Sequence, residues 1–135
     1  MRPETLLDFM GVAEHLKCNM RHSRMTDHRR ESVAEHTYRL CVFAWLVKEE
    51  FPNCDMDKVM KMCLFHDLGE ALTGDIPAFV KTDDDRETEG DALTLLTAML
   101  PGKERQELDE LFGELEREET MEAKIVHALD KMETL

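Results

Sequence analysis

The 135-residue sequence contains little glycine, proline or aromatic residue: six Gly, four Pro, one Trp and one Tyr. This scarcity argues against a turn-rich β-protein, and the ten Met and many Leu, Glu, Lys and Ala favour helices. Basic residues are also few, since 17 Lys and Arg stand against 30 Asp and Glu and give a formal charge of −13. That charge excludes a general binder of long nucleic acid or of anionic membranes. With 42% apolar residues, the chain can still bury a core.

Long apolar runs and closely paired cysteines are absent as well. The longest apolar run, Leu40 to Val47, is far shorter than the ~20 residues that cross a bilayer, so no membrane segment is expected. The N-terminus leads into an amphipathic stretch and not into the apolar core of a signal peptide, which predicts a cytoplasmic protein. The four cysteines form no C-x-x-C pair and are expected to be reduced.

Helical periodicity runs through most of the chain. It predicts a helix over residues 5–17, a second from a capping box at Ser32 and Glu35 to about residue 50, and a third from Asp55 to about residue 73. The second helix is apolar on every side in its latter half and is expected to be enclosed. Further helices are expected at roughly 87–100, 103–117 and from 120 onward. Residues 18–31 are expected to be irregular, and residues 83–85 to form a solvated acidic loop.

No alternating strand pattern and no linker is present in the sequence. The fold prediction is therefore all-α, a compact single domain over residues 1–135 with five to seven helices.

The acidity is unevenly distributed. Residues 1–40 hold seven basic and six acidic residues, so nearly all of the negative charge lies in the rest of the chain. Four arginines stand close together within the first part: Arg21, Arg24, Arg29 and Arg30. Such a segment in an acidic protein indicates a small anionic ligand, or a solvated loop whose arginines pair with nearby acids.

Four residues that can bind metal stand on predicted inward surfaces: His36, His66, Asp67 and Asp130. Burying several ionisable groups is costly unless something compensates them, and a divalent metal would do so. On a continuous helix Glu70 would lie next to both His66 and Asp67. Two imidazoles and two carboxylates favour an open site for Mn, Fe, Co, Ni or Zn over a closed structural zinc, and predict activation of a phosphoryl group or a water.

Three sequence blocks are placed around these residues: E-S-V-A-E-H at 31–36, H-D-x-x-E at 66–70 and G-D-I-P at 74–77, with Asp130 following. Together they resemble the HD-domain metal-dependent phosphohydrolases, and most of all their 5′-deoxynucleotidase branch. The resemblance covers about residues 5–135. It implies a helical bundle of the HD-domain type, one divalent transition metal per chain, a nucleotide substrate and a homodimer.

The resemblance also implies roles for individual residues. The metal ligands would be His36, His66, Asp67 and Asp130. Glu70 would handle the water or a proton transfer, Asp75 would lie beside the 5′ oxygen of the substrate, and Arg21 would contact its phosphate. His22 stands where relatives often have a Trp that reads the 2′ position of the sugar, so the preference for deoxyribose stays open. Relatives usually continue well beyond Asp130, so either this member is short or the sequence is truncated.

The function predicted is metal-dependent removal of the 5′-phosphate from nucleoside or deoxynucleoside monophosphates. One alternative is a dinuclear HD-type oxygenase or phosphodiesterase, which needs extra His ligands between the H-D pair and Asp130, where only His127 stands. Another is a non-catalytic helical module that binds metal or nucleotide. Glu70 and Asp75 argue against that module, since a structural site has no use for two further acids nearby.

Overall fold

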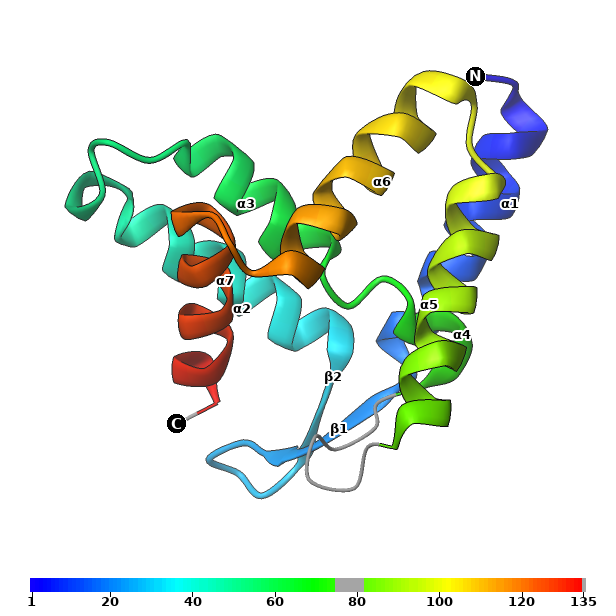
Figure 1. Ribbon diagram of the computed structural model, residues 1–135. Coiled ribbons are helices and arrows are strands. Elements are labelled where there is room, and N and C mark those ends of the chain that lie inside the picture. The colour runs from blue at the N-terminus through cyan, green and yellow to red at the C-terminus, as the bar shows by residue number, and fades with distance from the viewer. Residues whose placement is uncertain (75–81, 135) are drawn as a thin grey trace.

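The computed structural model describes residues 1–74 and 82–134 (Figure 1). Its elements are helices and one short hairpin, and in chain order they are α1 (Pro3–Ala13), the 3₁₀ turn η1 (Glu14–Lys17), β1 (Met20–Arg24), β2 (Arg30–Ser32), α2 (Val33–Leu46), the 3₁₀ turn η2 (Lys48–Glu50), α3 (Met56–Phe65), α4 (Glu70–Thr73), α5 (Asp83–Ala98), α6 (Gly102–Arg117) and α7 (Met121–Glu133). In this described part, six helices have ten or more residues and α4 is a single turn. The all-α prediction is confirmed.

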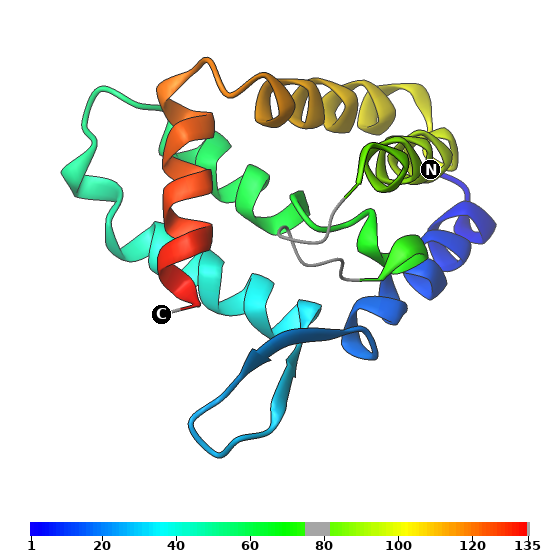
Figure 2. The ribbon, with the colours of Figure 1, turned by 60° about the horizontal axis from the view of Figure 1, so that its bottom comes forward.

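The centre of the fold is formed by α2, α3 and α7, which all pack against one another. Figures 1 and 2 show α7 lying across α2 and α3, and α6 also packs against α3. On the other side of the molecule, α4 packs against α5. Fully buried side chains from the three central helices form the core, among them Leu40, Val59, Met62 and Val126. Such burial of apolar surface is the main stabilising contribution to the fold.

None of the helices described for residues 1–74 and 82–134 combines the length and the apolar character needed to cross a membrane.

The start of α2 is fixed by the predicted capping box. The hydroxyl oxygen of Ser32 accepts a hydrogen bond from the Glu35 backbone N–H at 3.1 Å, and the Glu35 carboxylate accepts one from the Ser32 N–H at 2.8 Å. Two backbone donors at the helix N-terminus are thus satisfied reciprocally. His36 follows directly in the first turn, so the capping box also fixes the position of its imidazole.

The expectation that the latter half of α2 is enclosed is wrong. Leu40 and Ala44 are fully buried, but Tyr38, Trp45 and Leu46 are largely exposed. One face of α2 packs on α3 and α7, and the opposite face is not covered by any element of the described chain. The helix therefore has one buried side, as an amphipathic helix does.

The predicted third helix is interrupted. Asp55 caps it as expected by accepting from the Lys58 N–H, but α3 ends at Phe65 and residues 66–69 form turns before α4 begins. The Cys63 carbonyl accepts a hydrogen bond from His66 Nδ1 at 2.8 Å. The backbone bonds that follow join residues three apart, including those from Leu68 to Phe65 and from Glu70 to Asp67. The argument from ideal helical spacing for Glu70 therefore does not hold.

The acidic run at 83–85 is the first turn of α5 and not a loop. Thr82 caps this helix, because its side chain accepts from the Asp85 N–H while the Asp85 carboxylate accepts from the Thr82 N–H. Carboxylates in a first helical turn face the positive end of the helix dipole, which stabilises them there. The sequence expectation missed this helix start by about four residues.

The basic segment expected to be irregular forms an antiparallel hairpin, with Met20 opposite Ser32 and Arg24 opposite Arg30. Figure 2 shows this hairpin extending away from the helices. Arg30 reinforces the pairing, since its Nε donates to the Arg21 carbonyl at 2.9 Å. The end of β2 is also the cap of α2, so the hairpin and the helix that carries His36 are joined without a loop.

Candidate metal centre

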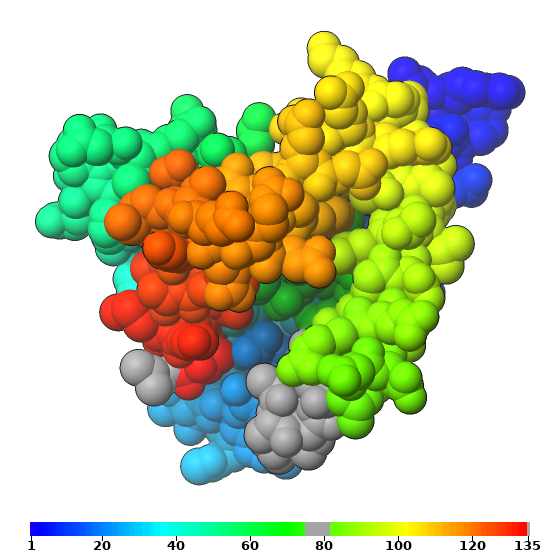
Figure 3. Space-filling model, viewed as in Figure 1, coloured from blue at the N-terminus to red at the C-terminus, as the bar shows by residue number. Residues whose placement is uncertain are grey.

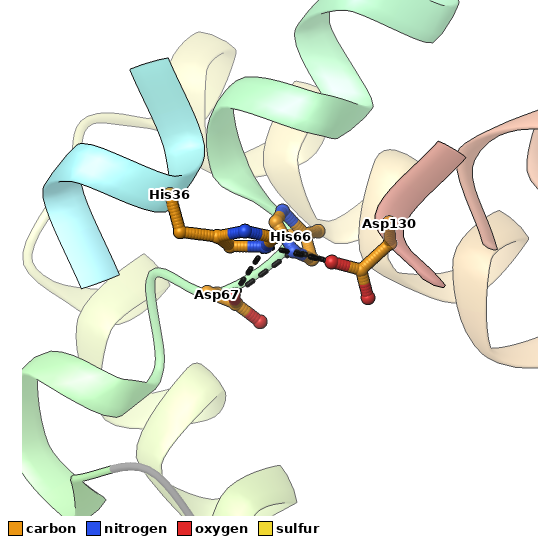
Figure 4. A group of neighbouring side chains, drawn as sticks. All are labelled: His36, His66, Asp67 and Asp130. Carbon is orange, nitrogen blue, oxygen red and sulfur yellow. Dashed lines mark hydrogen bonds and ion pairs between the residues drawn. The ribbon is translucent and has the colours of Figure 1, made fainter. Parts of the chain in front are cut away.

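The structure brings His36, His66, Asp67 and Asp130 together. One ligand atom from each lies within 4.8 Å of the others. Figure 4 shows their side chains pointing toward a common centre, His36 from the first turn of α2, His66 and Asp67 from the turn after α3, and Asp130 from α7. Three elements distant in sequence thus contribute to one site.

The shortest contacts in this group join imidazole nitrogens to carboxylate oxygens. His36 Nε2 lies 2.7 Å from Asp130 Oδ1 and 3.8 Å from Asp67 Oδ2. His66 Nε2 lies 2.9 Å from Asp67 Oδ2 and 3.3 Å from Asp130 Oδ1. The two rings stand edge to face, with centroids 5.6 Å apart. Both Nε2 atoms therefore face the same two carboxylates.

The protons on the two imidazoles can be placed from their other nitrogens. A carbonyl oxygen can only accept, so the bond to the Cys63 carbonyl requires a proton on Nδ1 of His66. Nδ1 of His36 faces the Glu133 carboxylate, which in its ionised form likewise only accepts. In each neutral ring, Nε2 then carries a lone pair directed at the carboxylates.

Four electron-pair donors therefore meet at one point. Nε2 of His66 is buried and has no hydrogen-bond partner among the described residues. Such a cluster requires a positive charge at its centre, either protons on the imidazoles or a cation. Neutral imidazoles and carboxylates are ligands of divalent transition metals, and a carbonyl or carboxylate on Nδ1 is their usual outer partner. The residues present fit a divalent metal.

The protonation equilibria of the metal-free cluster agree with this requirement. Burial lowers the pKa of His66, but the charges of Asp67 and Asp130 outweigh it and raise this pKa well above its usual value. Burial raises the pKa of Asp130, but the hydrogen bond with His36 and the nearby charge of the His66 imidazole outweigh burial and lower this pKa. The cluster thus attracts positive charge strongly, as a cation site does.

Two buried acids that the sequence analysis did not select lie behind His36. Glu31 and Glu133 form a second group with the His36 ring, again within 4.8 Å. Burial raises the pKa of Glu31, and the nearby charge of Glu133 raises it further. A signal for Glu133 exists in the sequence, because it follows Asp130 by three residues and therefore shares its face of α7.

Arg21 lies on the hairpin, close to the four-residue group of His36, His66, Asp67 and Asp130. Its Nε lies 3.0 Å from a Glu31 carboxylate oxygen, and its Nη1 lies 3.8 Å from Asp67 Oδ2. The guanidinium therefore stands beside the four-residue group. His22 follows Arg21 on β1 and is exposed, and side chains that follow one another in a strand point to opposite faces.

The two remaining predicted residues are Glu70 and Asp75. Glu70 is half-buried at the start of α4, where its backbone carbonyl accepts from the Asn19 side chain. Asp75 lies outside the described residues. The roles of both stay predictions.

His127, the residue on which a dinuclear site would depend, is occupied elsewhere. Its Nε2 donates to the Leu115 carbonyl at 3.0 Å and lies 3.4 Å from a carboxylate oxygen of Glu118. Both partners belong to the end of α6 and the residue that follows it. His127 is therefore not part of the four-residue group.

Figure 3 shows the surface hollowed between α7 and α5, with atoms of the hairpin and of the α3–α4 region at the bottom of the recess. The elements that bound it include those that carry Asp130, His66 and Arg21. A small ligand can therefore approach the group from this side.

A helical fold that brings together two imidazoles and two carboxylates from α2, the turn after α3 and α7 is typical of a metal-binding helical protein. The HD-domain family model matches residues 13–135. The chain belongs to the HD-domain family, and the resemblance recognised in the sequence is confirmed.

Several curated proteins are similar to this chain. The 5′-deoxynucleotidase HDDC2 of Homo sapiens is 37% identical over 109 residues, covering 79% of this chain and 52% of the human protein. The protein of the same name from Xenopus laevis is 34% identical over 137 residues, covering 98% of this chain and 67% of its own length. The chain spans about half the length of the human, bovine and mouse relatives it matches.

Solved structures share the fold. A predicted metal-dependent phosphohydrolase from Magnetospirillum magnetotacticum superposes with a TM-score of 0.88 at 30% identity, covering 98% of this chain and 68% of that one. A conserved hypothetical protein from Pyrococcus furiosus follows with a TM-score of 0.78, also at 30% identity, covering 94% of this chain and 73% of that one.

Proposed function

We propose that this chain is a metal-dependent phosphohydrolase that removes the 5′-phosphate from deoxynucleoside monophosphates. The observation that carries the proposal is the convergence of two imidazole Nε2 atoms and two carboxylates on one point, with both Nδ1 atoms held by other groups. The relatives named 5′-deoxynucleotidase support the substrate class. The acidic charge of the chain agrees with a mononucleotide and not with long nucleic acid.

The cofactor in this proposal is one divalent transition metal per chain, held by His36, His66, Asp67 and Asp130. The donor set accepts Mn, Fe, Co, Ni or Zn. A metal bound there supplies Lewis-acid polarisation of the phosphate and lowers the pKa of a water. His127 is hydrogen-bonded to the Leu115 carbonyl, away from these four residues, which supports one metal ion per chain.

The roles proposed for the protein groups are those that the resemblance to the family implies. Arg21 binds the phosphate, since its guanidinium stands beside Asp67 and can donate two parallel hydrogen bonds to phosphate oxygens. Glu70 orients the attacking water or takes its proton, which is a task for a half-buried carboxylate. Asp75, outside the described residues, protonates the leaving 5′ oxygen. The side chain of His22 is exposed on the face of β1 opposite Arg21, so its contact with the substrate stays a prediction.

The assembly and location of the protein are also proposals. A homodimer is implied by the resemblance to the family, and sedimentation of the purified chain would measure it. The short apolar runs and the lack of a spanning helix in the described chain agree with a cytoplasmic location.

The experiment that tests this function is phosphate release from a panel of nucleoside 5′-monophosphates, in ribose and deoxyribose forms, with added Mn or Co. Glu70→Gln should retain the metal and lose about 10²- to 10⁴-fold in kcat, the usual contribution of a general base. The matched control is Glu87→Gln, at an exposed position of α5, which should keep full turnover.

The outcomes separate the alternatives. Release from deoxynucleotides with loss in the Glu70 variant supports the proposal. Metal binding without release from any substrate would favour the non-catalytic module. Full activity of Glu70→Gln would show that another group activates the water.

A further inference from the structure

The metal group contains one ligand whose outer contact is a buried carboxylate. His36 is fully buried, and its Nδ1 lies 2.5 Å from Oε2 of Glu133. The side chain of Glu133 is only 1% exposed. A buried charge of this kind is costly unless a partner compensates it, and here the partner is the His36 ring.

The Glu133 carboxylate is itself held in place. Its other oxygen, Oε1, lies 3.4 Å from Nη1 of Arg39, one turn after His36 on α2. Its backbone belongs to the last turn of α7, three residues after Asp130. The same rigid helix thus supplies one ligand in front of His36 and the carboxylate behind it.

We propose that Glu133 is a positioning residue of the metal centre, which orients His36 by accepting the hydrogen bond from its Nδ1. This bond fixes the proton on Nδ1 and therefore leaves the lone pair on Nε2, the atom that faces Asp67 and Asp130. It also fixes the rotation of the ring. The inference rests on the proposed function, since it assumes that the group binds a metal.

A second cation between Glu31, His36 and Glu133 would be the other explanation of these buried acids. An ion on Nδ1 would displace its proton, and His36 would then have to bind two cations as an imidazolate. A hydrogen bond to Glu133 needs no such deprotonation. Glu31 already has a cationic partner, because Arg21 lies 3.0 Å from its carboxylate.

The test is the metal affinity of Glu133→Gln, measured without substrate by competition with a coloured chelator for Co²⁺ or Mn²⁺. Loss of an outer carboxylate of this kind weakens metal binding by about 10- to 100-fold. The absorption spectrum of bound Co²⁺ should change as well, since the His36 ring is no longer held at one angle. The matched control is Glu122→Gln on the same helix, where affinity and spectrum should equal those of the original protein.

A purely structural role would give a different result. In that case Glu133→Gln would lower the melting temperature of the metal-free protein but leave its metal affinity and the Co²⁺ spectrum unchanged. That result would overturn the inference. If Glu133→Gln does not fold, Glu133→Asp replaces it, because it keeps the charge but withdraws the carboxylate from Nδ1. An affinity within twofold of the original protein in that variant would overturn the inference as well.

The failure of this inference can be told from failure of the proposed function. If the unmodified chain binds metal but releases no phosphate, the function is wrong, and a weakened Glu133→Gln still supports the positioning role. If Glu133→Gln binds metal normally and the unmodified chain is an active phosphohydrolase, only the positioning role is wrong.

Discussion

Metal binding should stabilise the fold, because the proposed ligands come from three elements that only folding brings together. His36 and Asp130 are 94 residues apart in sequence yet share a 2.7 Å contact. An unfolded chain holds no such site, so the binding free energy adds to the free energy of unfolding. At a metal concentration of 100 times the dissociation constant, this contribution is about 2.7 kcal/mol.

The expected change in melting temperature follows from the size of the chain. An unfolding entropy of about 2.1 cal/mol/K per residue gives about 0.3 kcal/mol per kelvin for 135 residues. The melting temperature should therefore rise by about 10 °C on saturation with Mn²⁺ or Co²⁺, relative to a sample with chelator. Far-ultraviolet circular dichroism, which reports helix content, measures this shift.

Asp130→Asn should remove most of that shift, since it deletes one charged ligand. The matched control is Asp109→Asn, at an exposed position of α6, which should retain the full shift. An equal rise in melting temperature for Asp130→Asn and the unmodified chain would refute the assignment of the metal to this site.

Two further predictions concern the hairpin and the start of α2. Arg21→Ala should lower kcat/KM by about 10- to 100-fold, because a hydrogen bond to a charged group contributes about 1.5–3 kcal/mol. Steady-state kinetics measures this loss, with Arg24→Ala, at an exposed position of the same strand, as the control. Equal kcat/KM values for the two variants would count against phosphate binding by Arg21. The hydrogen bond from Arg29 lowers the pKa of Glu35 from 4.5 to about 2. The ionised carboxylate therefore stabilises the fold above pH 4.5, and this contribution is lost as the pH falls from 4.5 to 2. Urea midpoints of the metal-free protein across this range should fall more steeply than those of Glu35→Gln, and parallel curves would contradict the shift.

The helices were predictable where their signals are local. The capping box of Ser32 and Glu35 is complete within four residues, and it forms as expected. The end of α3 was not predictable, because the apolar period continues through residue 73. Two tertiary features are found at the interruption: the His66 ring bonds to the Cys63 carbonyl, and Gly69 packs against α5, where a Cβ would come within 3.1 Å of Leu93. Contacts of this kind do not show in spacing.

The hairpin was missed for a related reason. The residues of β1 are mostly polar and include no β-branched residue, so strand propensity is low. What stabilises the hairpin is its pairing with β2 and the bond from Arg30 to the Arg21 carbonyl. Tertiary context thus overrides local preference.

The candidate site, like the fold, was predictable only in part. His36, His66, Asp67 and Asp130 were selected from residue type and predicted burial, and the structure brings all four together. Glu133 was not selected, although its spacing from Asp130 places both on one face of α7. Its importance depends on which nitrogen of His36 faces it, and only three-dimensional geometry gives that information.

The measurement that tests the account most directly is a titration of metal-free protein with Mn²⁺ or Co²⁺, in which phosphate release from a deoxynucleoside 5′-monophosphate is followed against metal equivalents. The account predicts no release without metal and a linear rise that reaches its plateau at one equivalent per chain. Release that persists with chelator, or a plateau only at two equivalents per chain, would contradict a mononuclear phosphohydrolase.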